Sequence, residues 1–197
     1  MTKEEFFNIT KNATLTECLH IARKYVLHGI PKVFLGREED YYDFRSLIAS
    51  HFNIGFHEVF IVGSAKLGFS YHKDSVFSLD SDIDVVLVNE RLFESFYSQI
   101  CDYQYDLDLG ILTRTAEERK QYNSFLKYLV KGWMRPDKLP PKIQNRAIKS
   151  EWFDFFRSLS NGQSCVGNYK VSGGLFKNYS YLEKYYSQSI FQTTQNI

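Results

Sequence analysis

The sequence predicts an α/β (or α+β) fold, in which a small mixed β-sheet is flanked by N- and C-terminal helices. Two short apolar runs, 58–62 and 83–88, are rich in β-branched residues and have the length of strands. Much of the remaining chain carries apolar residues at helical spacing. With 197 residues, 44% of them hydrophobic, the chain has the size of one globular domain.

We expect this domain to span 1–197, with a core of about 55–115. The preceding 1–54 is expected to be helical. Thr14 and Glu17 have the spacing of a capping box before an amphipathic stretch. A second helix is predicted over Glu38–Phe52 from its apolar side.

The two predicted strands carry the polar residues of most interest. The first run ends at Gly63-Ser64, and Asp82 follows 19 residues after Gly63, with Asp84 two residues later. Because side chains alternate along a strand, Asp82 and Asp84 point the same way while Ile83 and Val85 point into a core. Two carboxylates about 7 Å apart on one strand face suit a divalent metal such as Mg²⁺. Solvated acids on an edge strand would show the same pair.

The rest of the chain continues with alternating elements. A helix is predicted near 90–101, and Tyr105–Leu112 alternates like a strand, although a solvated hairpin would look the same. Thr115 and Glu118 form another capping box, and Gly132 marks the end of that helix. The elements expected after it are a connector at Pro136, Pro140 and Pro141, a helix over 142–160, a strand over 168–176 and a helix near 178–190.

Together, the Gly63-Ser64 segment and the Asp82/Asp84 pair resemble the DNA polymerase β-like nucleotidyltransferase superfamily. Its signature is a strand ending in Gly-Ser, a short helix and then a strand bearing Asp-x-Asp; the match covers about residues 58 to 88. The resemblance implies that Asp82 and Asp84 hold Mg²⁺ (or Mn²⁺), and that Gly63 and Ser64 seat a nucleoside triphosphate. Lys66 is a further candidate phosphate contact, although a solvated lysine explains it as well. A P-loop is excluded, because Phe69 stands where its lysine would be.

The superfamily normally has a third carboxylate on a later strand. Asp108 is our candidate, with Asp106 as the alternative on the same face of the predicted strand. The later strand-like segment 168–176 contains no acid. The alternative is therefore a site that binds a nucleotide without transferring it.

Charge divides the chain unevenly. Residues 1–115 hold 11 Lys/Arg and 17 Asp/Glu, whereas the basic 116–197 holds 13 and 6. The basic part would attract a triphosphate or RNA, or the two parts would attract each other. The start is polar, no apolar run is long enough to span a membrane, and the three cysteines are scattered, so we expect a cytoplasmic protein without disulfides.

The function that these residues and the resemblance imply is metal-dependent nucleotidyl transfer from an NTP to a hydroxyl of RNA, protein or another nucleotide. The resemblance also implies a bacterial toxin–antitoxin or anti-phage (antiviral defence) context with a co-encoded protein partner. The alternatives are a catalytically degenerate nucleotide-binding or partner-binding subunit, and an RNA-binding module that uses the basic part of the chain.

Overall fold

The computed structural model describes residues 1–73, 75–139, 142 and 146–195. Its α-helices are α1 (Lys3–Thr10), α2 (Leu15–Ile21), α3 (Glu38–Phe52), α4 (Gly63–Leu67), α5 (Glu90–Asp108), α6 (Ala116–Leu129), α7 (Arg146–Ser158) and α8 (Tyr179–Gln195). The strands are β1 (Val59–Val62), β2 (Phe69–Ser70), β3 (Ser75–Val76), β4 (Ile83–Val88), β5 (Trp133–Met134) and β6 (Val171–Phe176). A π-helical segment, η1 (Ala22–Leu27), continues α2, and short 3₁₀ turns are η2 (Lys32–Phe34), η3 (Phe56–Glu58) and η4 (Pro136–Lys138). The predicted α/β (α+β) class is confirmed.

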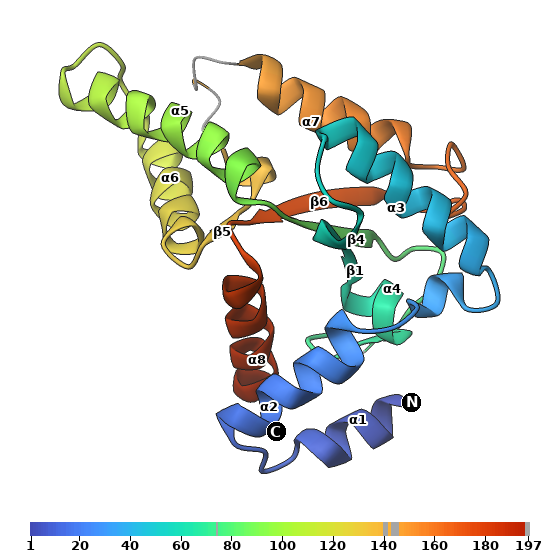
Figure 1. Ribbon diagram of the computed structural model, residues 1–197. Coiled ribbons are helices and arrows are strands. Elements are labelled where there is room, and N and C mark those ends of the chain that lie inside the picture. The colour runs from blue at the N-terminus through green and yellow to red at the C-terminus, as the bar shows by residue number, and fades with distance from the viewer. Residues whose placement is uncertain (74, 140–141, 143–145, 196–197) are drawn as a thin grey trace.

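The main sheet has the strand order β1-β4-β6-β5 (Figure 1). β4 pairs antiparallel with β1 and parallel with β6, and β6 pairs antiparallel with β5. β2 and β3 form a separate small hairpin. Two of the four strands of the main sheet thus come from residues after 116, so the sheet extends beyond the predicted core of 55–115.

Helices cover both faces of the sheet (Figure 1). Ile83, Val85 and Leu87 point to one face, where the core includes residues of α3, α5, α6 and α7. Val86 and Val88 point to the other face and pack with residues of α1, α2, η1 and α8. β4 is therefore apolar on both sides along most of its length, which is typical of a central strand with a parallel neighbour.

Several predicted elements have the expected ends. The capping boxes at Thr14 and Thr115 begin α2 and α6, and α3 has the predicted bounds Glu38–Phe52. β1, β4 and β6 form where strands were predicted, although β1 and β6 are shorter. The predicted helix over 142–160 appears as α7, and part of its expected start lies outside the described residues, as do Pro140 and Pro141.

The strand predicted over Tyr105–Leu112 is wrong. Residues up to Asp108 continue α5, which Asn89 caps by accepting a hydrogen bond from the Leu92 backbone N–H at 2.9 Å. The apolar spacing explains the helix, because side chains three or four residues apart share one face. The buried side chains on that face are Phe93, Phe96, Ile100 and Tyr103.

Ion pairs join the acidic and basic parts of the chain. Lys177 binds Glu94 at 2.6 Å and Lys170 binds Asp82 at 3.2 Å, so each of these pairs joins a base of the basic part to an acid of the acidic part. Arg23 binds Glu183 at 2.6 Å in the opposite sense. None of the helices in the described part of the chain has the length and apolar character that crossing a bilayer requires.

The packing of α7 on the sheet leads to a stability prediction. A Cβ added at Gly173 of β6 would overlap the ring of Phe156 on α7, whereas one added at Gly174 would lie 3.1 Å from Nε1 of Trp133. We expect Gly173→Ala to lower the free energy of unfolding by about 1–3 kcal/mol through overpacking. Gly174→Ala, the matched control, should lower it less. Denaturant unfolding of both variants measures this, and equal effects would contradict the described contact.

Candidate functional site

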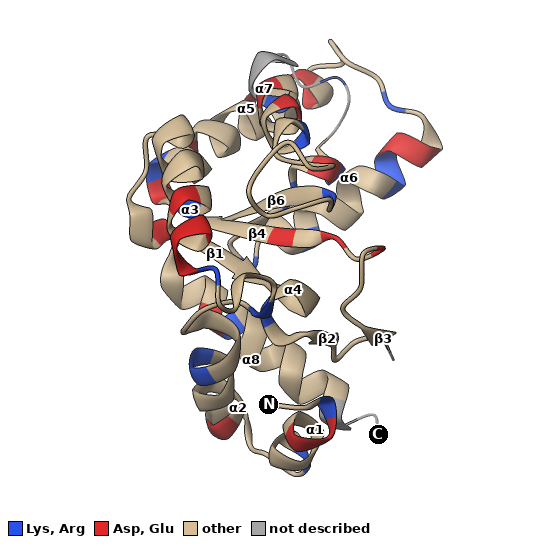
Figure 2. Ribbon diagram, turned by 90° about the vertical axis from the view of Figure 1, so that its right-hand side faces the viewer, with Lys and Arg blue, Asp and Glu red and all other residues tan. Residues whose placement is uncertain are grey.

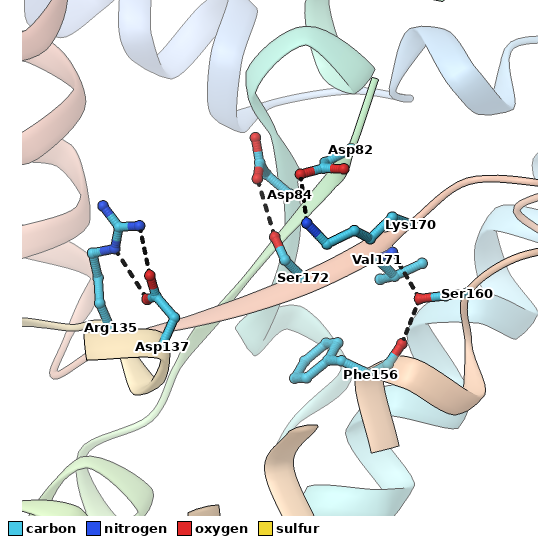
Figure 3. A network of polar contacts seen from close by, with 9 residues as sticks. All are labelled: Asp82, Asp84, Arg135, Asp137, Phe156, Ser160, Lys170, Val171 and Ser172. Carbon is cyan, nitrogen blue, oxygen red and sulfur yellow. Dashed lines mark hydrogen bonds and ion pairs between the residues drawn. The ribbon is translucent and has the colours of Figure 1, made fainter. Parts of the chain in front are cut away.

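The two acidic residues lie at the open end of β4. Asp84 is the second residue of the strand, and Asp82 lies in the segment just before it. Figure 3 shows the two carboxylates close to each other, and the charge of Asp82 contributes to raising the pKa of Asp84. Their shared face continues into the covered Val86 and Val88, but α8 and the N-terminal helices leave both acids accessible to solvent.

Strand register places a hydroxyl beside Asp84. Asp84 is paired with Val62 on β1 and with Ser172 on β6. The Oγ of Ser172 donates a hydrogen bond to Oδ1 of Asp84 at 3.2 Å (Figure 3). Asp84 therefore has one oxygen engaged by the neighbouring strand.

Gly63 lies against the other oxygen of Asp84. Its φ of +64° belongs to the left-handed region, which side chains rarely adopt. A Cβ at this position would lie 2.8 Å from Oδ2 of Asp84. The glycine is thus required both by its backbone conformation and by the approach of the carboxylate.

The charge of Asp84 is poorly stabilised. Burial raises the pKa of its carboxyl above the ordinary value, Asp82 raises it further, and the hydrogen bond from Ser172 together with the charges of Arg135 and Lys73 lowers it. The side chain keeps an accessible surface, yet the surrounding protein still excludes enough water to disfavour the anion. Carboxyl groups with a raised pKa are common at functional sites, where a bound cation stabilises the ionised form.

Besides Lys73, the basic side chains of Lys170 and Arg135 lie around the acids. Lys170 donates to Oδ2 of Asp82 at 3.2 Å, and both side chains are largely exposed, so this pair adds little stability. Arg135 follows β5 and donates two hydrogen bonds to Asp137, at 3.2 and 2.9 Å (Figure 3). In Figure 2, red marks the acidic start of β4, at the end of the strand that joins the preceding segment.

Two of the predicted site residues have other surroundings. Lys66 is only 7% exposed, and its ammonium donates to the backbone carbonyls of His28 and Gly29, the latter at 2.6 Å. Burial lowers the pKa of Lys66 to about 8. It ties α4 to the end of η1, so its assignment as a phosphate contact is corrected to a structural role.

Asp108 is likewise not brought to Asp82 and Asp84. It is the last residue of α5, where its Oδ1 accepts a hydrogen bond from Gln104 at 2.7 Å. α5 starts after the opposite end of β4, and a helix of this length extends by roughly 27 Å; Figure 1 shows it running away from the sheet. Asp106 lies in the same last turn. The position on β6 that faces Asp84 is held by Ser172.

The donor set that remains is two carboxylates and a hydroxyl. Within the described residues, no cluster of three or more His, Cys, Asp or Glu side chains is arranged to hold a metal ion. Mg²⁺ needs fewer protein ligands, because it is commonly bound by one or two carboxylates together with substrate phosphates. Asp82 and Asp84 therefore fit Mg²⁺ or Mn²⁺ bound with a phosphate ligand, and do not form a complete metal cage.

Two residues near the acids were missed from the sequence. Ser172 was hidden because a serine in a strand carries no specific signal, although its segment was predicted as a strand. Arg135 follows a strand of only two residues, which is too short for a periodicity to show.

Comparison with protein-family models, with curated proteins and with solved structures gives no match for this chain. The site is therefore interpreted from its own geometry.

The raised pKa of Asp84 predicts how stability changes with pH. In the unfolded chain the carboxyl titrates near its ordinary value of 3.8, and in the folded protein it titrates higher. At pH values above the pKa in the folded protein, Asp84 is ionised and its burial lowers the free energy of unfolding. At pH values below the pKa in the unfolded chain, Asp84 is protonated in both states and this loss disappears. Asp84→Asn should therefore raise the melting temperature of chelator-treated protein at neutral pH, and this gain should vanish in acid.

Asp80→Asn is the control, because it makes the same substitution at an exposed loop position. Its melting temperature should follow that of the wild type at every pH. Thermal unfolding followed by circular dichroism provides the comparison. A wild type that is more stable than Asp84→Asn at neutral pH, with chelator present, would contradict a desolvated Asp84.

Proposed function

We propose that this protein is a metal-dependent nucleotidyltransferase that transfers a nucleotide from an NTP to a hydroxyl acceptor. The observation that supports it best is the arrangement around Asp84. One carboxylate oxygen faces Ser172 and the other lies against Gly63 at the end of the neighbouring strand. Asp82 adds a second carboxylate on the same side (Figure 3).

The residues of this site have distinct roles in the proposed reaction. Asp82 and Asp84 hold Mg²⁺ or Mn²⁺, which when bound neutralises phosphate charge. Gly63 lets the Asp84 carboxylate lie against the backbone at the start of α4, where the triphosphate binds. Ser64, the second residue of α4, is half-buried and seats the triphosphate with Gly63. The acceptor oxygen bonds to the α-phosphorus, the bond to pyrophosphate breaks with its electron pair leaving on pyrophosphate, and the acceptor proton passes to solvent.

The basic side chains of Arg135 and Lys170 support binding of an anion near the acids. Arg135 is held by Asp137 and lies over the rings of Tyr128 and Trp133, at 5.6 and 5.5 Å from their centroids. Lys170 is exposed and pairs with Asp82 at 3.2 Å. Exposed pairs of this kind are weak, so a phosphate can take Lys170 from Asp82 at low cost. The acceptor is a hydroxyl of RNA, of a protein partner or of another nucleotide. The three cysteines are unpaired, which agrees with a cytoplasmic setting.

A second candidate function is nucleotide binding without transfer. Ser172 favours it, because this residue faces Asp84 from the adjacent strand, where the resembled enzymes have a third carboxylate. A hydroxyl is a weaker metal ligand than a carboxylate and a poorer proton acceptor.

Transfer of an α-³²P label distinguishes the two candidates. NTPs labelled at the α-phosphate are incubated with Mg²⁺ and RNA or protein acceptors, using wild type, Asp84→Asn and Asp108→Asn. We expect the wild type to label an acceptor. Asp84→Asn should lose roughly 100-fold, equivalent to about 2.7 kcal/mol. Asp108→Asn is the matched control and should retain full activity, since Asp108 lies at the far end of α5.

Ser172→Asp completes the comparison by placing a third carboxylate opposite Asp84. If the wild type binds Mg·NTP but labels no acceptor, and the Ser172→Asp variant labels one, the binding-only function is established. Full activity of Asp84→Asn would contradict both candidates.

A further inference from the structure

A groove of about 300 Å³ lies between the end of α6 and the side of α8. Tyr128 and Lys131 line it from the α6 end, and Tyr185, Gln188 and Gln192 line it from α8. This volume is at the lower end of the range for small-molecule sites. It suits one nucleoside-sized group and excludes a folded macromolecule.

One end of the groove lies at Arg135. The ring of Tyr185 packs against the ring of Trp133, with 4.2 Å between their centroids. The guanidinium of Arg135 lies over the same Trp133 ring at 5.5 Å. The ring of Tyr128, on the other wall, lies under the guanidinium of Arg135. A molecule in the groove would thus have one end at Arg135, whose charge also acts on the carboxyl of Asp84.

The wall along α8 is held in place by polar contacts with the β2–β3 hairpin. His72 binds Oγ of Ser189 through Nε2 at 2.9 Å and Oγ1 of Thr193 through Nδ1 at 3.1 Å. The hydroxyl of Tyr71 lies 3.3 Å from the same Ser189 oxygen. These contacts fix the hairpin against α8, so the groove exists before any ligand binds.

The lining has the chemistry of a nucleobase site. Gln188 and Gln192 are one helical turn apart and share a face of α8. Each amide offers both donors and acceptors, which matches the polar edge of a base. Tyr128 and Tyr185 supply aromatic surface of the kind on which bases pack. Apart from Lys131 and the titratable His72, the lining side chains are uncharged.

We propose that this groove binds the nucleoside part of the donor NTP, with the α-phosphate beside Asp84 and with Gln188 and Gln192 contacting the base. This inference rests on the proposed function, because it uses the metal and triphosphate position at Asp82 and Asp84. The groove is too small for a macromolecular acceptor. The opposite side of the site, at Asp82 and Lys170, is widely exposed and leaves room for the acceptor.

Blocking the groove tests the inference. Gln188 is exposed on α8, so Gln188→Trp fills the groove without altering the core. Asn123→Trp is the control, since it adds the same bulk at an exposed position of α6 that does not line the groove. Isothermal titration measures the affinity of each variant for Mg²⁺ with ATP, GTP, CTP or UTP, and with inorganic tripolyphosphate. Circular dichroism verifies folding.

We expect Gln188→Trp to lower NTP affinity by about tenfold or more, corresponding to ~1.4 kcal/mol, and to leave tripolyphosphate affinity unchanged. The Asn123→Trp control should match the wild type with both ligands. The smaller change Gln192→Leu should reduce the difference in affinity among the four NTPs, which keeps the test valid if the tryptophan variant is unstable.

The outcomes separate this inference from the proposed function. If the protein binds tripolyphosphate, and Gln188→Trp leaves the NTP affinity unchanged, the groove inference is overturned and the proposed function stands. If Gln188→Trp lowers the NTP affinity but the wild type transfers no label to any acceptor, the groove inference is supported and the proposed transferase activity is overturned. Binding of neither ligand by the wild type would overturn both.

Discussion

Pairing of β4 on both edges fixes the positions of Asp84, Gly63 and Ser172 relative to one another. The antiparallel register with β1 puts Val62, and therefore Gly63, beside Asp84, and the parallel register with β6 puts Ser172 on its other side. A slip of one residue would turn Asp84 toward the core that Ile83 and Val85 now occupy. Such a slip would bury the charge of Asp84 among apolar side chains, which is costly. The apolar core thus holds the acids where they are.

The same register makes Gly63 and Asp84 mutually dependent. The carboxylate occupies the space that a side chain at Gly63 would need, and Lys66, one turn later, anchors α4 to the carbonyls of His28 and Gly29. The cost of this arrangement is a carboxylate held away from water, with a raised pKa. A bound cation would offset that cost, which is the physical reason for interpreting the pair as a metal site.

The sequence predicted the parts of the fold whose signals are local. β-branched runs identified β1 and β4, capping boxes identified α2 and α6, and alternation placed Asp82 and Asp84 on one face. It failed where two periodicities overlap, because Tyr105, Leu107 and Leu109 alternate while Leu107 also extends the helical stripe of α5. It could not anticipate Ser172 beside Asp84 or the buried ammonium of Lys66, since both depend on contacts between distant segments.

The most direct test of the central claim is a crystal structure with Mg²⁺ and an NTP analogue that resists cleavage between the α- and β-phosphates. The account predicts a metal ion bound by Asp82 and Asp84, with the triphosphate beside Gly63. A metal and triphosphate bound elsewhere, without contact to either acid, would contradict it.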